Sequence, residues 1–438
     1  MILSGWGRFP RADCALIEAR DAGDIERAIR SGHALIARGA GRAYGDAALN
    51  PAATLAMGRM NRLLDFDAET GALTCQAGVS LSDILDLFTP RGWFPPVTPG
   101  TRFVTVGGMI AVDVHGKNHH REGSFGAWLD WLDLMTADGE VARCSPTANA
   151  DLFDATIGGM GLTGVILAAR FRLRPIETDL IRQRVVRAAN LDQALHVFET
   201  TSDWTYSVAW IDCMAAGAAL GRSIVYLGEH ARAAELPRGA PPYRRRRPGR
   251  LGAPFDLPSW TLNGLSIRAF NAVIGGLPRA EESLVGVDPY FYPLDAVANW
   301  NRIYGARGFV QYQCALPLYV GRDGLVEILT RVSVHGAGAF LAVLKRFGPG
   351  GRGLLSFPLE GYTLAMDFPA NASSLKLLNE LDAVTAAHGG RLYLAKDARS
   401  APAMMAASYP RLADFAALRA RFGADRRFGS LLSRRLEL

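Results

Sequence analysis

The sequence predicts an α+β protein with two domains, and three observations lead to that prediction. Its 438 residues, 49% of them hydrophobic, are enough to bury two separate cores. The glycine-rich segments of the first half stand between short helices and strands in an order that a parallel dinucleotide-binding sheet does not allow. Near Pro175 the pattern changes, and a second series of strands and helices follows.

Composition excludes several classes of protein. The net charge of +6 is modest for this length, so nucleic acid is not an expected partner. We find no run of about 18 apolar residues that indicates a transmembrane helix. The first residues lack the basic and apolar regions of a secretory signal. Five scattered cysteines exclude a CxxC motif and argue against a disulfide framework, so we expect a reducing, cytoplasmic compartment.

The first glycine-rich segment, residues 38–46, follows an expected helix over residues 25–32 and a strand over 34–37. It superficially resembles a dinucleotide fingerprint, but Tyr44 occupies the third glycine slot and no long helix follows. Successive backbone N–H groups in such a loop still bind phosphate well. A surface turn is the alternative, which three glycines and two arginines in so short a span disfavour.

The next segments alternate between strands and helices. Residues 73–77 predict a strand, and Ser80 with Asp83 predicts the cap of a helix over residues 84–88. A further strand is expected over residues 128–136, followed by a hairpin turn at 137–140.

Residues 99–120 form the second glycine-rich segment. Gly107 and Gly108 allow a backbone to approach a ligand closely, and Val112 and Val114 predict a short strand. The strand would end in a polar cluster of His115, Lys117, Asn118, His119 and His120. Acid–base groups beside a backbone cradle are typical of an anionic cofactor next to a reaction centre. A solvated polar loop is an equally good interpretation of this segment alone.

The third segment, residues 158–164, contains a literal GxGxxG after an expected helix over residues 151–157. A strand pattern over residues 165–173 follows it. The order helix–glycines–strand is the reverse of the Rossmann order, and no acidic residue stands about 20 positions later. A nicotinamide-binding Rossmann domain is therefore disfavoured.

Beyond Pro175 we expect a helix over residues 191–198 and strands over 207–211 and 223–227. Residues 229–262 have few regular signals, and we interpret them as a mobile loop or lid. They contain the basic run 243–250, which is able to meet phosphate or anionic lipid, although a solvated loop is the simpler interpretation.

Residues 309–316 predict a strand with Gln311 and Gln313 on one face and Tyr312 on the other. Two glutamines on one face suggest a polar pocket wall, and a solvent-facing surface is the alternative. Further strands are expected over residues 340–347 and 362–368, with Lys345 and Tyr362 as pocket candidates. Helices over residues 375–388 and 412–422 flank a short strand that ends at Lys396 and Asp397.

Taken together, the three glycine-rich segments resemble the FAD-cradling pattern of flavoproteins of the vanillyl-alcohol-oxidase and p-cresol-methylhydroxylase (PCMH) type. The likeness is closer to the decaprenylphosphoryl-β-D-ribose oxidase family, and it spans nearly the whole chain. His-Gly-Lys-Asn-His-His is its specific motif. The matching stretches are Ser4–Arg8, His115–His120, Phe309–Gln313, Phe347–Pro349, Asp367–Pro369, Leu392–Asp397 and Arg434–Leu438.

The resemblance implies a two-domain fold of the vanillyl-alcohol-oxidase/PCMH type. Residues 1–178, completed by residues 391–438, would bind FAD without a covalent link, since residues 38–46 contain no histidine. Residues 179–390 would form a substrate domain with a mainly antiparallel sheet. The implied cofactor-binding residues are Arg38, Gly39, Ala40, Gly41, Arg42, Ala43, Tyr44, Gly45, Asp46, Gly100, Thr105, Val106, Gly107, Gly108, Val112, Asp113, Val114, His115, Gly158, Thr163, Val165 and Tyr393.

The resemblance also implies the chemistry, which is oxidation of the ribose 2'-hydroxyl of a polyprenylphosphoryl-β-D-ribose to a keto sugar. Lys396 matches the family's essential lysine, and His115 with Tyr44 is expected to handle the proton. The implied substrate-binding residues are Lys117, Gln311, Gln313, Lys345 and Lys396. No metal is expected, because the histidines lack a metal-ligand spacing. One departure is Ala365, which stands where well-known members place a cysteine that covalent inhibitors attack.

A short-chain reductase is the implied partner, because it would complete epimerisation to the arabinose donor for cell-envelope glycans. The lipid substrate implies a peripheral position at the inner face of the membrane, with the basic run docking on anionic lipid. Two alternatives stay open. One is a soluble sugar or alditol oxidase of the same superfamily that uses oxygen. The other is a flavin-free binding protein that keeps the scaffold.

Overall fold

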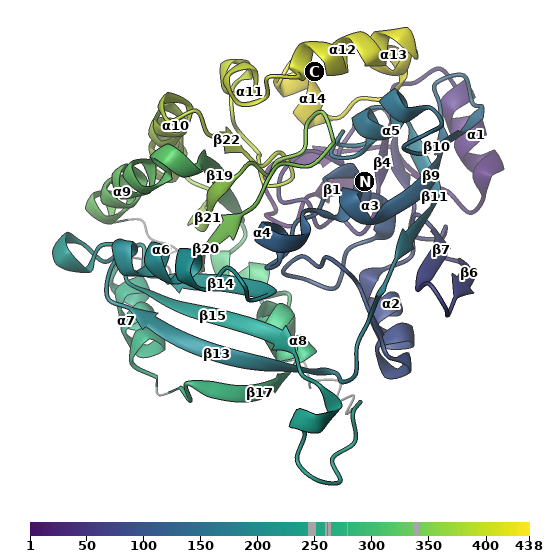
Figure 1. The fold of residues 1–438 in the computed structure, drawn as a ribbon. Helices are drawn as coiled ribbons and strands as arrows, with labels where there is room; N and C mark the ends of the chain where they lie inside the picture. Colours follow the sequence, from purple (N-terminus) through teal and green to yellow (C-terminus); the bar gives the residue numbers. More distant parts are fainter. Residues whose placement is uncertain (244–250, 259–260, 262–263, 278, 337–340) are drawn as a thin grey trace.

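The computed structural model describes residues 1–438 except 244–250, 259–260, 262–263, 278 and 337–340 (Figure 1). Short helices and mostly antiparallel sheets follow one another along the chain, which confirms the α+β class. Three sheets carry most of the fold. One has three parallel strands, one has five antiparallel strands, and one has eight antiparallel strands.

The first half contains the two smaller sheets of these three. The parallel sheet has the order β3 (Leu16–Glu18), β5 (Thr54–Ala56), β4 (Ile36–Arg38). The five-stranded sheet has the order β10 (Val141–Cys144), β9 (Leu129–Met135), β11 (Val165–Arg172), β7 (Ala72–Gln76), β6 (Leu63–Asp67). The predicted strands and the hairpin between β9 and β10 are confirmed.

Two helices of the first half begin with capping side chains; α2 has the predicted cap, whereas α1 begins three residues before the expected start at residue 25. Helix α1 (Ala22–Arg30) starts after Asp21, whose side chain accepts a hydrogen bond from the backbone N–H of Asp24. Helix α2 (Leu81–Phe88) starts with a capping box between Ser80 and Asp83. Such caps satisfy N–H groups that have no partner inside the helix.

The strand predicted at Val112 and Val114 is wrong. Residues 106–111 form helix α3 (Val106–Ala111), and the chain leaves it at Val112. The hydroxyl of Thr105 accepts from the backbone N–H of Gly108 at 3.3 Å and starts the helix. The glycines serve close packing, because a Cβ on Gly107 would lie 2.9 Å from the Cβ of Ala77. The cap and this tertiary contact outweigh the β-propensity of the valines.

The second half is organised around the eight-stranded sheet. Its order is β17 (Glu282–Gly286), β13 (Leu180–Ala188), β15 (Ser223–His230), β14 (Tyr206–Ile211), β20 (Ala342–Phe347), β21 (Gly361–Pro369), β19 (Phe309–Pro317), β22 (Arg391–Leu392). One face packs on α6 (Leu191–Thr200), α9 (Leu318–His335) and α10 (Ala372–Ala387), which lie together in Figure 1. The opposite face is free to line a cavity.

Smaller elements connect these sheets. They are β1 (Ile2–Ser4), β2 (Arg11–Asp13), β8 (Trp93–Phe94), β12 (Arg174–Pro175), β16 (Leu251–Gly252), β18 (Val297–Ala298), α4 (His119–Glu122), α5 (Ala150–Thr156), α7 (Gly264–Gly276) and α8 (Val287–Phe291). Among the described residues, no helix is long and apolar enough to span a membrane.

The last 48 residues return to the first half. After β22 come α11 (Pro402–Ser408), α12 (Leu412–Arg421), α13 (Ala424–Arg427) and α14 (Leu431–Arg435). Figure 1 shows α12 and α13 beside α5, far from the eight-stranded sheet's other edge. The backbone N–H of Leu35 donates to the carbonyl of Arg427 at 2.9 Å, and that of Gly429 donates to the carbonyl of Leu35 at 3.0 Å. The domain boundaries at residues 178 and 390 stay a prediction.

Candidate functional site

A cavity of about 600 Å³ lies where the two halves of the chain meet. Its wall comes from the loop after β4, from α3 and the segment after it, from the glycines before β11, from the free face of the eight-stranded sheet, and from residues 393–396. This size and a mostly apolar wall with a few polar groups are typical of cofactor and substrate sites. All three glycine-rich segments therefore contribute to one site.

The loop after β4 forms a cradle that depends on glycine. A Cβ on Gly39 would lie 2.2 Å from the hydroxyl of Thr105. Gly41 has a φ of +65°, and a Cβ there would lie 2.4 Å from the guanidinium of Arg38. Side chains at either position would disturb these contacts, and both glycines line the cavity, where no side chain of their own covers the backbone.

Most predicted cofactor-binding residues line this cavity. They are Gly39, Ala40, Gly41, Arg42, Ala43, Tyr44, Gly100, Thr105, Gly107, Gly108, Val112, Val114, His115 and Tyr393. The hydroxyl of Tyr393 donates to the carbonyl of Val112 at 3.2 Å, which joins the C-terminal segment to the end of α3. Contact of these residues with FAD stays a prediction.

The other predicted cofactor-binding residues lie behind the wall, where they hold its segments in place. They are Arg38, Gly45, Asp46, Val106, Asp113, Gly158, Thr163 and Val165. The buried carboxylate of Asp113 accepts from the hydroxyls of Ser124 at 2.7 Å and Ser356 at 2.6 Å. The guanidinium of Arg38 donates to the carbonyl of Ser4 at 2.7 Å. From the third segment Met160, Gly161 and Gly164 line the cavity instead, together with Ile166 at the start of β11.

Lys396 projects its ammonium group into the cavity against an aromatic face. The Nζ atom lies 3.4 Å from the centroid of the Tyr44 ring. The backbone N–H of Tyr44 donates to the carbonyl of Ala395 at 2.8 Å, which fixes the two segments against each other. Burial lowers the pKa of Lys396, while the carboxylate of Asp367 acts to raise it. The pKa of Lys396 is about 7, so its ammonium group gains or loses a proton near neutral pH.

Asp367 is a site residue to which we assigned no role from the sequence. It is fully buried on β21, and its carboxylate accepts from the Nε2 of Gln311 at 2.5 Å. Burial raises the pKa of this carboxyl, whereas Gln311 and Lys396 act to lower it. Asp367 and Lys396 thus affect each other's pKa, each favouring the charged form of the other. The sequence signal was its Asp-Phe-Pro motif, which marked the family but not the charge pair.

His115 stands at the turn after α3 with its ring buried among Phe347, Phe357 and Tyr393. Its Nε2 lies 3.1 Å from the Nε2 of Gln313, and its buried Nδ1 has no hydrogen-bond partner among the residues that the structure describes. Burial lowers the pKa of His115 well below its ordinary value, and Lys345 adds to this effect. The imidazole is therefore neutral at pH 7.

Two further lysines face the same cavity. Burial lowers the pKa of Lys345 to about 8 and that of Lys117 to about 7. The ammonium of Lys117 donates to the carbonyl of Tyr290 and lies 4.1 Å from that residue's ring centroid. The chain has four lysines among 48 basic residues, and three of them line this cavity. Since arginine is used almost everywhere else, the rarity of lysine in the sequence is a signal that marks these three positions.

The alternation of side chains along β19 places Gln311 and Gln313 at the cavity, as predicted. Both are buried, so the solvent-facing alternative is wrong. The pocket prediction for Tyr362 is also wrong. Tyr362 lies on the opposite face of β21, and its hydroxyl donates to Glu199 at 2.6 Å. Of β21, Ala365 lines the cavity, and the alternation along the strand puts Asp367 on the same face of the sheet.

The remaining histidines of the polar cluster lie near the wall but do not line it. The Nε2 of His120 lies 2.8 Å from the carbonyl oxygen of Trp204. The His119 ring packs on Phe347 with a centroid distance of 4.5 Å, and burial lowers its pKa to about 3. Within the described part of the chain, no three histidine, cysteine or acidic side chains gather as metal ligands.

Comparisons with known proteins agree with this geometry. The family model of the FAD binding domain matches residues 15–145. Decaprenylphosphoryl-β-D-ribose oxidase of Mycolicibacterium smegmatis is 36% identical over an alignment that covers 100% of this chain and 97% of that protein. The chain belongs to the decaprenylphosphoryl-β-D-ribose oxidase family. It is an FAD-dependent oxidoreductase.

More distant relatives place this family within a larger fold. L-gulonolactone oxidase of Mus musculus is 34% identical over 31% of the chain. The solved structure of BBE-like 1 of Physcomitrella patens has a TM-score of 0.66 at 13% identity, covering 94% of this chain and 89% of that one. Members of the decaprenylphosphoryl-β-D-ribose oxidase family thus have the predicted vanillyl-alcohol-oxidase/PCMH-type fold.

The residues of the cavity fit FAD. The glycine cradle admits a ligand against its backbone, because Gly39 and Gly41 line the cavity without side chains. The unpartnered Nδ1 of His115 offers a buried polar atom to a bound group. Three ammonium groups supply positive charge for anionic ligands. Gly39–Tyr44, Thr105–Gly108 and Tyr393–Lys396 are the segments that would hold the cofactor.

Proposed function

We propose that this chain oxidises the 2'-hydroxyl of a polyprenylphosphoryl-β-D-ribose to the 2'-keto sugar. Full-length similarity to an oxidase whose name gives that substrate supports the proposal. The observation that carries it is the placing of three lysines and two glutamines around one cavity beside the glycine cradle. Ammonium groups suit a phosphodiester, and amides suit sugar hydroxyls.

The protein's own groups divide the work. Bound FAD supplies the hydride acceptor. Lys396 stabilises the negative charge that develops on the sugar oxygen as the carbon–hydrogen bond breaks. His115 accepts the hydroxyl proton, and the carboxylate of Asp367 acts to raise the pKa of Lys396. The apolar wall excludes water, which strengthens each of these interactions.

The remaining polar groups orient the substrate. Gln313 donates to the hydroxyl of Thr363 at 3.2 Å, so its amide is held at a fixed angle on β19. Gln311 is held in the same way by Asp367. Lys345 and Lys117 bind the phosphate, and their lowered pKa values make that binding pH-dependent.

Anaerobic mixing with a short-chain polyprenylphosphoryl ribose tests the function. We expect the yellow flavin absorbance to bleach in a single turnover, with keto sugar formed in equal amount. Free alditols should give no bleaching. Bleaching by alditols together with peroxide release in air would instead identify a soluble alditol oxidase. Protein that takes up no FAD would favour a binding protein. Release of all flavin on acid precipitation tests the non-covalent link.

We also propose that a short-chain reductase completes epimerisation. The keto sugar has lost two electrons and must receive a hydride from a second donor to become the arabinose product. Mixing this protein with such a reductase and its nicotinamide should give arabinose from ribose. The oxidase alone should stop at the keto sugar.

Peripheral binding to the inner face of the membrane is a further part of the proposal. Residues 244–250 of the basic run and Trp260 lie outside the described residues. Next to them, Leu251 and Phe255 are exposed. Replacing the four arginines 244–247 by serine should abolish co-sedimentation with anionic liposomes. Unchanged co-sedimentation would contradict this role.

A further inference from the structure

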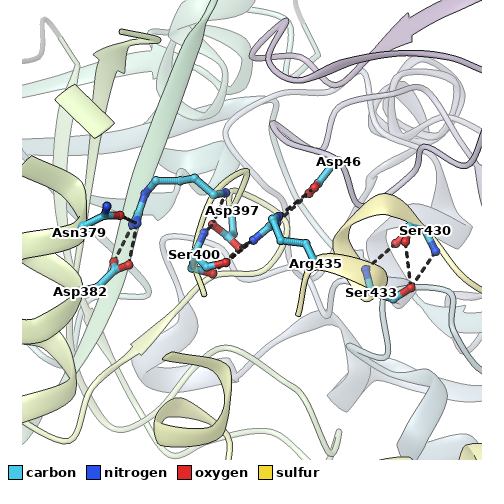
Figure 2. A network of polar contacts seen from close by, with 9 residues as sticks. Asp46, Asn379, Asp382, Asp397, Ser400, Ser430, Ser433 and Arg435 are labelled. Carbon is cyan, nitrogen blue, oxygen red and sulfur yellow. Dashed lines mark hydrogen bonds and ion pairs between the residues drawn. The ribbon is translucent and has the colours of Figure 1, made fainter. Parts of the chain in front are cut away.

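Arg435, near the end of α14, joins two segments of the site from behind (Figure 2). Its Nε and Nη2 donate to the two carboxylate oxygens of Asp46 at 3.0 Å and 2.9 Å. Its Nη1 donates to the carboxylate of Asp397 at 2.9 Å and to the carbonyl of Ser400 at 2.7 Å. One guanidinium thus makes four hydrogen bonds to three residues.

Both carboxylates are buried, and each forms an ion pair with Arg435. The side chains of Asp46 and Asp397 are 4% and 3% exposed. Asp397 also accepts from the backbone N–H groups of Arg399 and Ser400 and from the Ser400 hydroxyl, so its orientation is fully determined. Buried carboxylates this close to each other repel unless a cation lies between them.

The position of the two acids in the chain matters. Asp46 stands two residues after Tyr44, and Asp397 is the residue after Lys396. Gly45 lies against the backbone of Asp397 so closely that a Cβ on Gly45 would be 1.9 Å from its carbonyl oxygen. The Tyr44–Ala395 backbone bond is the direct link between the same segments.

We propose that Arg435 is a positioning residue that sets the Lys396 ammonium against the Tyr44 ring by clamping Asp46 to Asp397. It touches neither the cavity nor the reacting atoms. Without the clamp, the two segments retain one short backbone bond, and the acids repel. Lys396 then leaves its place above Tyr44, and the charge-stabilising group is misplaced. This inference rests on the proposed role of Lys396.

The matched variants are Arg435→Gln, Arg435→Lys and the control Arg222→Gln. Arg222 makes a comparable two-pronged contact with buried Asp212, at 2.9 Å and 2.7 Å, but lies in the β14–β15 hairpin away from Lys396. Lysine at position 435 keeps the charge but cannot form the fork. Thermal unfolding and FAD content of each holoprotein measure the structural cost.

Two readouts separate positioning from stability. The first is labelling of Lys396 by acetic anhydride, followed by mass spectrometry, with exposed Lys376 as the internal standard. The second is the rate constant for anaerobic flavin reduction. We expect Arg435→Gln to raise Lys396 labelling severalfold and to lower the reduction rate constant by about tenfold or more. Arg435→Lys should be intermediate in both, and KM should change little.

A Lys396→Met background completes the test. Arg435→Gln should lower the reduction rate no further there, because the group that it positions is already gone. The proposal is overturned if Arg435→Gln matches Arg222→Gln in melting temperature and leaves Lys396 labelling unchanged. Labelling needs no substrate. A failure of the proposed substrate would leave the wild type unbleached and the labelling result intact, so the two failures are distinguishable.

Discussion

The basic residues that line the inner part of the cavity include three lysines, and lysine differs from arginine in how easily it loses its charge. Arginine stays charged at any accessible pH, whereas a buried lysine approaches neutrality and responds to a neighbouring anion. The chain uses arginine for almost all of its surface ion pairs and keeps three of its four lysines for one wall. The positive charge of the three cavity lysines therefore changes with pH and with a bound ligand, whereas that of the arginines elsewhere does not.

The first prediction concerns Lys345. Lys345→Met should raise KM for a polyprenylphosphoryl ribose by about tenfold and leave the maximal reduction rate within a few-fold, because the ammonium binds phosphate in both ground and transition states. Wild-type KM should rise between pH 7 and pH 9, as the group with a pKa of about 8 loses its proton. Lys376→Met on exposed α10 is the control. An equal fall in the maximal rate would place Lys345 at the reacting atoms instead.

The second prediction concerns Asp367. Its carboxylate acts to raise the pKa of Lys396 against the effects of burial and of Lys345. Asp367→Asn removes that charge, so the pKa of Lys396 falls further and less ammonium is present at pH 7. The alkaline limb of the reduction-rate profile should shift to lower pH by about one unit. The neighbours Tyr44 and His115 stay uncharged in that range, since burial raises the pKa of Tyr44 and lowers that of His115. A higher rate at pH 7, with an acidic limb that moves to lower pH, would show that Lys396 acts as a neutral base.

Among the elements, the sequence predicts those whose signals are local. Ser80 and Asp83 predict the start of helix α2. The alternation of side chains predicts β19 and the face on which Gln311 lies. Helix α3 was missed because two valines follow it and because Gly107 lowers helix propensity. What holds α3 is the cap at Thr105 and packing on Ala77, which is a neighbour only in the folded chain.

The same limit applies to the site. The glycine loop and the two glutamines carry their signals in the sequence. The effect of Asp367 on Lys396 depends on the register of β21 against β19, in which Asp367 lies opposite Gln311. Tyr362 was placed on the wrong face, because neighbouring residues of a strand point to opposite faces and a difference of one position reverses the face. Family motifs located these residues but did not reveal the contacts between them.

The third prediction tests the contact between the glycine loop and α3. Gly39→Ala forces the Thr105 hydroxyl away from its cap on Gly108, so we expect a loss of about 1–3 kcal/mol in unfolding free energy and weaker FAD binding. In a Thr105→Ala background the added methyl meets no hydroxyl, and its further cost should be small. Gly58→Ala is the control, since nothing lies within 4 Å of a Cβ there. Additive effects of the two changes would contradict the contact.

At the scale of the whole molecule, the site exists only when distant segments come together. The cradle comes from the first fifty residues, the proposed proton acceptor is residue 115, the glutamines come from β19, and the ammonium proposed to stabilise charge comes from residue 396. The last 48 residues reach the cradle through the Leu35 pairing and through Arg435. Bringing these distant segments together costs loop-closure entropy. A ligand that contacts all of them offsets part of that cost.

The last prediction follows from that arrangement. Adding FAD to apoprotein at a hundred times its dissociation constant should raise the unfolding free energy by about 2.7 kcal/mol, because FAD binds the folded chain alone. Hydrogen exchange should slow together in residues 39–44, 105–115 and 393–396, which share the cavity. Helix α6, on the far face of the eight-stranded sheet, is the internal control and should exchange as before. Slowing confined to residues 39–115 would mean that the cofactor ends before it reaches Lys396. In that case the ammonium group would serve the substrate alone.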